Sequence, residues 1–413
     1  MFTLKRQTMF TMKRQTTFCT ALALMCALLS PQGLRAQTAE PFEVWLKKLE
    51  QEAKGKGFDA ATVERALAGV TPIERVIELD RKQPEFTLTF GGYMNRVISD
   101  KRIERGRDLL VKHKDLLARV TAKHAVQPRF LVAFWGLETN FGDYFGAFPV
   151  AGALATLAHD GRRSAFFREQ LLAALDLMSR GDMPVDVKGS WAGAMGNFQF
   201  IPTTYRDFAV DFDGDNVRDL WFNLEDAFAS AANYLSRSGW NDERTWGREV
   251  HLPDGFDVSL TGLKQRRKLA EWQALGVRRA DGKRDLPDVD IEGAVLLPAG
   301  LTGPAFMVYD NFETILRWNR SIFYAIAVGH LADRLAGGGP FLKAPPADDV
   351  PMSRQDVIEM QTLLGQRGFD AGEPDGVIGA KTRSAVRAYQ RAKGLPADGY
   401  PSALILKHLK GSG

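Results

Sequence analysis

A single carboxylate within an apolar segment is the side chain of this sequence best placed to do chemistry. In the stretch RFLVAFWGLETNFG, residues 129–142, Glu138 is the only acidic residue, and no Lys or Arg lies between Phe130 and Gly142. Glutamate is rarely buried unless it is paired. The setting therefore indicates a functional carboxylate, and the alternative is a structural glutamate that is partly exposed or hydrogen-bonded.

The same segment predicts a helix over 129–140, because a proline precedes it and a glycine follows it. On this helix Glu138 shares the apolar face with Leu131, Phe134 and Trp135, near the C-terminal end. Desolvation and the negative end of the helix dipole both raise the pKa of a carboxyl group in such a place. A carboxylic acid that keeps its proton near neutral pH can give it to a leaving group, so we expect general acid catalysis from Glu138.

A second segment combines small residues with uncharged polar groups. It is GSWAGAMGNFQFIPTTY, residues 189–205. Gly193 and Gly196 are expected to let the backbone approach a ligand closely, and Ser190 and Gln199 supply short polar groups without charge. Alone, this segment also fits a packing site for helices.

A third segment, DFDGDNVRDLWFNLED, spaces carboxylates as in the first half of an EF-hand loop. Asp211, Asp213 and Asp215 stand at positions 1, 3 and 5, with a backbone carbonyl expected from Val217. Three carboxylates this close repel one another unless a cation lies between them. The pattern predicts a structural Ca²⁺ site, and the alternative is a solvated acidic turn.

Position 12 of this loop departs from the EF-hand pattern. It is Phe222, where a bidentate Glu is expected. The carboxylate that closes the loop must therefore come later, from Glu225 or Asp226.

The first 36 residues predict a secretory signal peptide. Basic residues precede the apolar stretch FCTALALMCALLS (18–30), which is too short to span a bilayer, and cleavage is expected after Ala36. Both cysteines, Cys19 and Cys26, lie in this segment, so the mature chain is expected to have no disulfide and no thiol catalysis. A lipid anchor at Cys26 is not expected, because a methionine precedes this cysteine.

The remaining residues carry no strong net charge. Beyond the predicted leader the chain has 49 basic and 50 acidic side chains, a net charge of −1. This balance gives no argument for a nucleic-acid partner.

The elements that must position these motifs are mainly helical. Helical periodicity covers 41–125 and 129–238, whereas 246–303 contains short strand patterns. The Gly/Pro-rich stretch 336–353 is typical of a linker, and a compact module of three helices follows it.

Taken together, two pairs of motifs resemble known families. GLETNFG (136–142) and GAMGNFQFIPTTY (193–205), followed by DFDGDNVRDLW and ANYLSRSGW, resemble the membrane-bound lytic transglycosylase B family over about 40–335. MQTLLGQRGFDAGEPDGVIGAKTRSAVRAYQ, near the C-terminus, resembles the peptidoglycan-binding domain 1 family.

The resemblance implies a lysozyme-like helical catalytic core with an N-terminal helical extension and a small β-containing insertion. A small three-helix wall-binding domain follows. The expected boundaries are a signal peptide at 1–36, a catalytic domain at 40–335, a linker at 336–352 and a wall-binding domain at 353–410. Within the catalytic domain, the core is expected at about 125–240 and 305–335 and the insertion at about 246–303.

The implied activity is cleavage of the β-1,4 bond between N-acetylmuramic acid and N-acetylglucosamine in peptidoglycan, without water, to form 1,6-anhydromuramic ends. Glu138 would act first as acid and then as base, with no catalytic cofactor. The sequence offers no second carboxylate in a comparable setting, which fits a substrate that supplies its own nucleophiles.

The resemblance also implies roles for other residues, and its lengthened acidic loop favours Asp226 over Glu225 as the closing ligand. Arg162 and Arg163 would meet lactyl or stem-peptide carboxylates, unless they are ordinary surface arginines. The substrate-binding residues implied in this way are Ser190, Gln199, Asn319, Tyr205, Tyr309, Arg162 and Arg163.

Three other functions compete with this interpretation: a muramidase that hydrolyses the same bond, a non-catalytic cell-wall-binding protein and a calcium sensor. The expected partner is the peptidoglycan glycan strand, the expected location is the periplasm, and the mature chain is expected to be monomeric without a membrane span.

Overall fold

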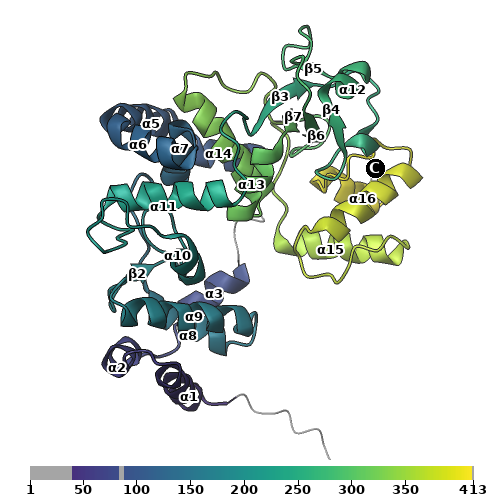
Figure 1. The fold of residues 1–413 in the computed structure, drawn as a ribbon. Coiled ribbons are helices and arrows are strands. Elements are labelled where there is room, and N and C mark those ends of the chain that lie inside the picture. The colour runs from purple at the N-terminus through teal and green to yellow at the C-terminus, as the bar shows by residue number, and fades with distance from the viewer. Residues whose placement is uncertain (1–39, 83–87, 412–413) are drawn as a thin grey trace, which may run out of the picture. The chain divides into compact units, whose positions relative to one another are not determined.

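The structure describes residues 40–82 and 88–411 of the 413-residue chain as a computed structural model (Figure 1). Helices dominate these residues, so the predicted mainly α fold is confirmed. The expected signal peptide at 1–36, with Cys19 and Cys26, lies outside the described residues. Within the described ranges, no helix has the length and apolar character needed to cross a bilayer.

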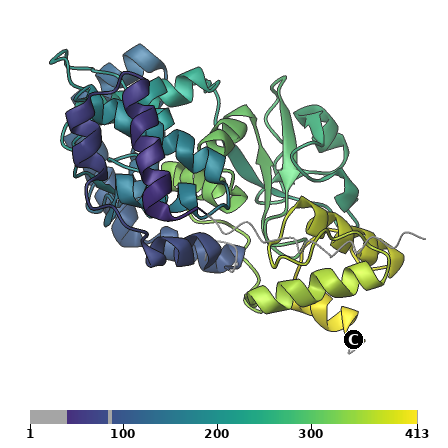
Figure 2. The same cartoon turned by 90° about the horizontal axis from the view of Figure 1, so that it is seen from below.

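The N-terminal extension consists of short amphipathic helices. The first two lie side by side and contact α8 and α9, as Figure 2 shows. The start of the second is fixed by Asp59, whose carboxylate accepts a hydrogen bond of 2.8 Å from the amide of Thr62. The helices of the extension are α1 (Phe42–Gly55), α2 (Ala60–Leu67) and α3 (Glu74–Lys82), and the core helices they contact are α8 (Val150–His159) and α9 (Ser164–Ser179).

The helical core surrounds α7 (Pro128–Thr139), in which Phe130 to Gly136 are all buried. Pro128 occupies the first helical turn, where its missing N–H costs nothing, and Asn140 ends the helix in the left-handed conformation. The helices that contact α7 are α5 (Asp100–Lys112), α6 (Lys114–His124), α11 (Leu224–Arg237) and α14 (Ile322–Leu335). The other core elements are α4 (Phe90–Val97), β1 (Phe148–Pro149), β2 (Lys188–Gly189), α10 (Pro202–Phe208) and α13 (Asp310–Trp318).

The predicted β-containing insertion is a five-stranded antiparallel sheet with strand order β4-β6-β7-β3-β5. Its own apolar cluster surrounds the fully buried Trp272. Its elements are β3 (Gly247–His251), the 3₁₀ turn η2 (Val258–Leu260), β4 (Arg266–Lys268), α12 (Leu269–Ala274), β5 (Arg278–Arg279), β6 (Glu292–Leu296) and β7 (Ala305–Val308).

The C-terminal module has three helices and a separate apolar cluster that includes Met360, Val386 and Leu409. It contacts the insertion, because the amide of Leu301 donates a hydrogen bond of 2.9 Å to the carboxylate of Asp398. The helices are α15 (Arg354–Gln366), α16 (Ala380–Ala392) and α17 (Ala403–Leu409).

Candidate active site

Glu138 lies at the penultimate position of α7 and is half-buried, whereas Phe130 to Gly136 on the same helix are buried. The chain leaves the helix through two non-glycine residues with positive φ, Asn140 at 52° and Phe141 at 63°. Such conformations cost free energy and persist where packing enforces them. The ring of Phe141 packs on Gly136, where a Cβ atom would lie 2.7 Å from it. The carboxylate is thus presented at a helix end whose backbone is held rigidly.

Two aromatic donors from the other side of the core bind the same oxygen of Glu138. The indole Nε1 of Trp318 donates a hydrogen bond of 2.9 Å to Oε1, and the hydroxyl of Tyr324 also donates to Oε1. Burial and the negative charge of Glu138 raise the pKa of Tyr324 well above its ordinary value, so this phenol keeps its proton. These bonds fix the orientation of the carboxyl group.

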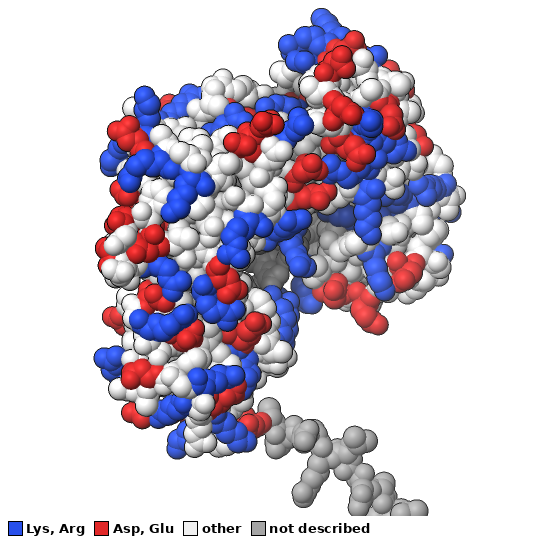
Figure 3. All heavy atoms as spheres, viewed as in Figure 1, with Lys and Arg blue, Asp and Glu red and all other residues white. Residues whose placement is uncertain are grey.

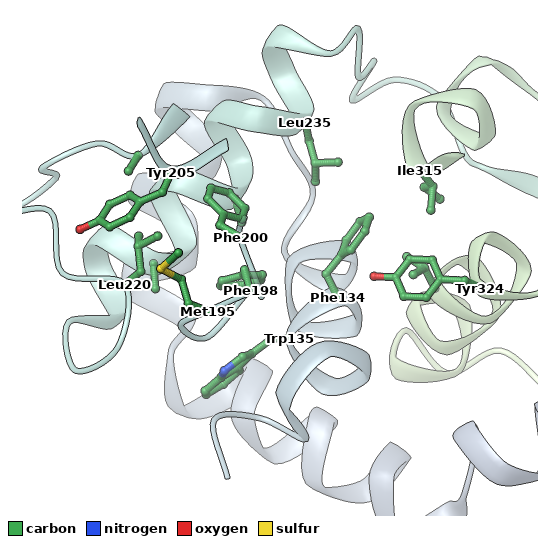
Figure 4. Packing of buried hydrophobic residues seen from close by; sticks show 14 of the residues in the cluster. Phe134, Trp135, Met195, Phe198, Phe200, Tyr205, Leu220, Leu235, Ile315 and Tyr324 are labelled. Carbon is green, nitrogen blue, oxygen red and sulfur yellow. The ribbon is translucent and has the colours of Figure 1, made fainter. Parts of the chain in front are cut away.

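Trp318 is itself held by aromatic packing. Its ring centroid lies 4.6 Å from that of Phe134, 5.0 Å from that of Tyr234 and 5.4 Å from that of Phe200. Figure 4 shows Phe134 between Phe198 and Tyr324, with the Tyr324 hydroxyl directed toward Phe134. Trp318 and Tyr324 are not among the residues predicted from the sequence, although the aromatic-rich stretch RWNRSIFY (317–324) contains both.

Asn197 joins the end of α7 to the glycine-rich segment. Its Oδ1 accepts a hydrogen bond of 2.8 Å from Trp135 Nε1, and its carbonyl oxygen accepts one of 2.9 Å from Thr139 Oγ1. Its side-chain Nδ2 donates to the carbonyls of Leu220 and Trp221. Asn197 is 1% exposed, so these bonds form in a dry interior. The Thr139 hydroxyl, next to Glu138, therefore anchors the end of α7 to the glycine-rich segment.

The glycines of this segment pack against protein, which corrects their predicted role toward a ligand. A Cβ atom on Gly193 would lie 2.5 Å from Leu154, and one on Gly196 would lie 2.8 Å from the carbonyl oxygen of Leu220. Both glycines have positive φ, so they are required by the turn and by close contact between segments.

Ser190 and Gln199 lie in this turn, and both keep a polar atom for a ligand. Ser190 Oγ accepts from the amide of Ala194 at 3.0 Å, which leaves its own O–H to donate. Gln199 has a φ of 49°, and its Nε2 donates to the carbonyls of Phe145 and Gly196 at 3.1 Å each. Its Oε1 is thus the atom that can accept from a sugar N–H.

Asn319 directly follows Trp318, and its Oδ1 accepts a hydrogen bond of 3.0 Å from the amide of Ser321. It is half-buried and lines a cavity of about 540 Å³ beside the α13–α14 turn. The chain therefore places Asn319 one residue from a direct partner of Glu138.

The structure corrects the prediction for Tyr205, which is 0% exposed and cannot touch a glycan. Its hydroxyl donates to the carbonyls of Asp182 and Arg218, and Figure 4 shows that it points away from Phe198 and Phe200. Tyr309 is 7% exposed and belongs to the apolar cluster of the insertion.

Arg162 and Arg163 bind a carboxylate of the chain itself. Asp80 is 0% exposed, and its two oxygens accept from Arg162 Nη1 at 2.9 Å and from Arg163 Nη2. A buried carboxylate requires such compensation. This pairing gives both arginines a role within the fold, and their side chains remain 48% and 43% exposed, so the expected contact with substrate stays a prediction.

The acidic loop brings four carboxylates together. One oxygen from each lies within 4.8 Å of the others, and the group consists of Asp211, Asp213, Asp215 and Asp226. Clustered hard oxygen donors fit Ca²⁺. Glu225 instead forms an ion pair of 2.5 Å with Arg119, so Asp226 is the residue that closes the cluster.

Asp226 shows the electrostatic cost of this arrangement. Burial, assisted by the charges of Asp213 and Asp211, raises its pKa to about 6, although the amides of Phe212 and Asp219 donate to it and oppose the shift. A cation at the cluster would offset this cost.

Comparison with known proteins now assigns the chain to a family. The family model for the transglycosylase SLT domain matches residues 41–333, which is more than half of the chain. The chain belongs to this family. A second model, for a putative peptidoglycan binding domain, matches residues 353–409. Both resemblances drawn from the motifs are thereby confirmed.

Named proteins and solved structures are both found among the relatives of this SLT family member. It is 30% identical over 304 residues to membrane-bound lytic murein transglycosylase B of Escherichia coli, which covers 68% of this chain and 79% of that protein. It is 48% identical to SltB3 from Pseudomonas aeruginosa, solved in complex with NAG-anhNAM-pentapeptide, with a TM-score of 0.86 over 90% of this chain and 100% of that one.

Another solved relative is the lytic transglycosylase Slt35 of Escherichia coli in complex with calcium. It shares 29% identity with this chain, with a TM-score of 0.59 over 70% of this chain and 92% of that one. As a member of this family, the chain is a lytic transglycosylase, and the predicted lysozyme-like helical core is confirmed.

Proposed function

We propose that the chain cleaves the β-1,4 bond between N-acetylmuramic acid and N-acetylglucosamine in peptidoglycan without water, forming 1,6-anhydromuramic ends. The observation that carries this proposal is the half-buried carboxylate of Glu138 at the end of a rigid helix, oriented by Trp318 and Tyr324. The anhydro sugar in the ligand of the SltB3 relative supports the same product class.

In the proposed reaction, protonated Glu138 gives its proton to the glycosidic oxygen, and the bond from this oxygen to C1 of the muramic acid breaks. The 2-acetamido oxygen of the same sugar stabilises the cation at C1. Glu138, now a carboxylate, removes the proton from the C6 hydroxyl while O6 attacks C1. The glutamic acid is restored and no water is consumed.

Ser190, Gln199 and Asn319 are proposed to position the sugar. Gln199 Oε1 can accept from an acetamido N–H, and the Ser190 hydroxyl can donate to an acetamido carbonyl or a sugar oxygen. The fixed turn around them supports this role, because preorganised groups lose little entropy on binding.

The acidic loop is proposed to hold one structural Ca²⁺ through Asp211, Asp213, Asp215 and Asp226, with the carbonyl of Val217 as a further ligand. The clustered oxygens and the Slt35 complex with calcium support this proposal. The ion would stabilise the loop and take no part in bond cleavage.

The C-terminal module is proposed to bind peptidoglycan and to retain the enzyme on its polymer. We propose a catalytic domain at 40–335, a linker at 336–352 and a wall-binding domain at 353–410, acting as a monomer in the periplasm after removal of residues 1–36.

The test is mass spectrometry of peptidoglycan digested with the full-length protein. Anhydromuramic ends are expected. Reducing ends would instead identify the hydrolytic muramidase, and an uncut polymer that still retains the protein would identify a non-catalytic binder.

A further inference from the structure

The cavity beside the α13–α14 turn lies between the catalytic region and the C-terminal module. From the catalytic side it is lined by Thr89 and by Asn319 to Phe323, and from the module by Arg383 and Tyr400. Its volume of about 540 Å³ is enough for several amino acid residues. Its walls are largely apolar, and the side chains that form them include Ile322, Phe323, Val350, Met352, Ile378 and Pro401.

Two guanidinium groups border this cavity without a partner. Across the described ranges, neither Arg320 nor Arg383 forms a side-chain hydrogen bond or an ion pair. Burial lowers the pKa of the Arg383 guanidinium from its ordinary value, yet arginine remains charged at any physiological pH. Asp349 also lines the cavity, but its carboxylate accepts a hydrogen bond of 2.5 Å from the hydroxyl of Tyr400.

Each remaining polar side chain of the lining accepts one hydrogen bond from a nearby backbone amide. Thr89 caps α4, Ser321 caps α14, and Asn319 accepts from Ser321. The cavity therefore offers apolar contact together with unpaired positive charge. On the face shown in Figure 3, both basic and acidic side chains border the hollow in the middle of the molecule. A ligand with carboxylate groups and an extended chain fits these properties.

The same short segment forms both this cavity and the partners of Glu138. Trp318 and Tyr324 donate to Glu138, whereas the five residues between them line the cavity. Consecutive Cα atoms are 3.8 Å apart, and an extended pentapeptide spans about 17 Å. A pentapeptide attached to a sugar bound at Glu138 is therefore long enough to extend beyond the α13–α14 turn.

We propose that this cavity binds the stem peptide of the glycan strand held at Glu138, with Arg320 and Arg383 as ligands for its carboxylates. This inference rests on the proposed function. Arg320 and Arg383 would thus bind the carboxylates that the family resemblance assigned to Arg162 and Arg163, both of which form ion pairs with Asp80.

Calorimetric titration of the full-length protein tests the proposal. The probes are NAG-NAM-pentapeptide and the peptide-free disaccharide NAG-NAM, neither of which contains the bond that is cut. We expect the peptide to tighten binding about tenfold, the value of one charge-assisted hydrogen bond. Arg383→Gln should remove most of this difference between the two probes.

The matched control is Arg391→Gln, on the same helix α16 but exposed and outside the cavity lining. It should keep the wild-type difference. Arg320→Gln supplies a second test on an exposed turn of the catalytic region, where a folding defect is not expected. It should also reduce the preference for the peptide-bearing probe.

Equal affinity of the wild type for both probes would overturn the proposal. An equal loss of affinity for both probes in Arg383→Gln would overturn it as well. Failure of the proposed function is distinguished by digestion of peptide-free glycan strands. Anhydro ends from such strands would support the chemistry at Glu138 even if the peptide adds no affinity.

Discussion

The Glu138 site and the acidic loop both depend on carboxylates, but they are built in opposite ways. Glu138 is one carboxylate held by side chains 180 and 186 positions further along the chain. The acidic loop gathers four carboxylates from sixteen residues, and backbone amides of the same loop donate to them. The Glu138 site is therefore formed by tertiary packing, whereas the acidic loop is formed by residues close together in the sequence.

This difference predicts different sensitivities. At Glu138, exchange of one carboxyl oxygen for nitrogen changes the reaction while the fold persists, because the surrounding aromatic packing remains. At the loop, loss of a ligand changes the free energy of unfolding through cation binding and leaves the chemical groups at Glu138 in place.

The largest effect is expected from Glu138→Gln. The amide keeps the shape and can still accept hydrogen bonds from Trp318 and Tyr324, but it cannot transfer a proton. We expect turnover of peptidoglycan to fall by about 10³-fold or more, with unchanged circular dichroism. Substantial remaining activity would show that another residue is the acid.

Tyr324→Phe should have the next largest effect. It removes one of the two donors that orient the Glu138 carboxyl, and we expect kcat/KM to fall by roughly tenfold. Tyr205→Phe is the matched control, because its buried hydroxyl contacts only backbone carbonyls. Similar losses in both variants would mean that Tyr324 acts through stability alone.

The sequence predicted the parts of both sites that depend on local spacing. The end of α7, the position of Glu138 on it and the aspartates of the loop all follow from short periodic patterns. Trp318 and Tyr324 were missed because their relation to Glu138 arises only when α13 and α14 pack beside α7. Periodicity describes one element at a time and cannot reveal such pairs.

Residue type alone also does not decide the role of a side chain. A tyrosine and two arginines suit a sugar and its carboxylates, but the fold uses Tyr205 in its core and both Arg162 and Arg163 to neutralise Asp80. The glycines similarly fit protein neighbours rather than ligand. Burial, which decides these cases, is a property of the whole fold.

Removal of calcium should produce a moderate effect confined to stability. Chelation is expected to lower the free energy of unfolding by about 2–3 kcal/mol if the ion is near 100 times its Kd. Asp226→Asn should abolish this difference, whereas Glu225→Gln should retain it because Glu225 is paired with Arg119. Denaturant unfolding with and without chelator gives the free energy of unfolding of the wild type and of both variants. If chelation still destabilises Asp226→Asn, Asp226 is not a ligand of the ion.

The smallest effect is expected at Phe222, which occupies the position where an EF-hand loop has its bidentate glutamate. The Phe222 side chain is 85% exposed, and Asp226 from α11 already completes the cluster. Phe222→Glu should therefore change the calcium-dependent part of the free energy of unfolding by less than about 0.5 kcal/mol. A large increase in calcium affinity, measured by titration, would mean that the loop can close as a regular EF-hand and that Asp226 is not the deciding ligand.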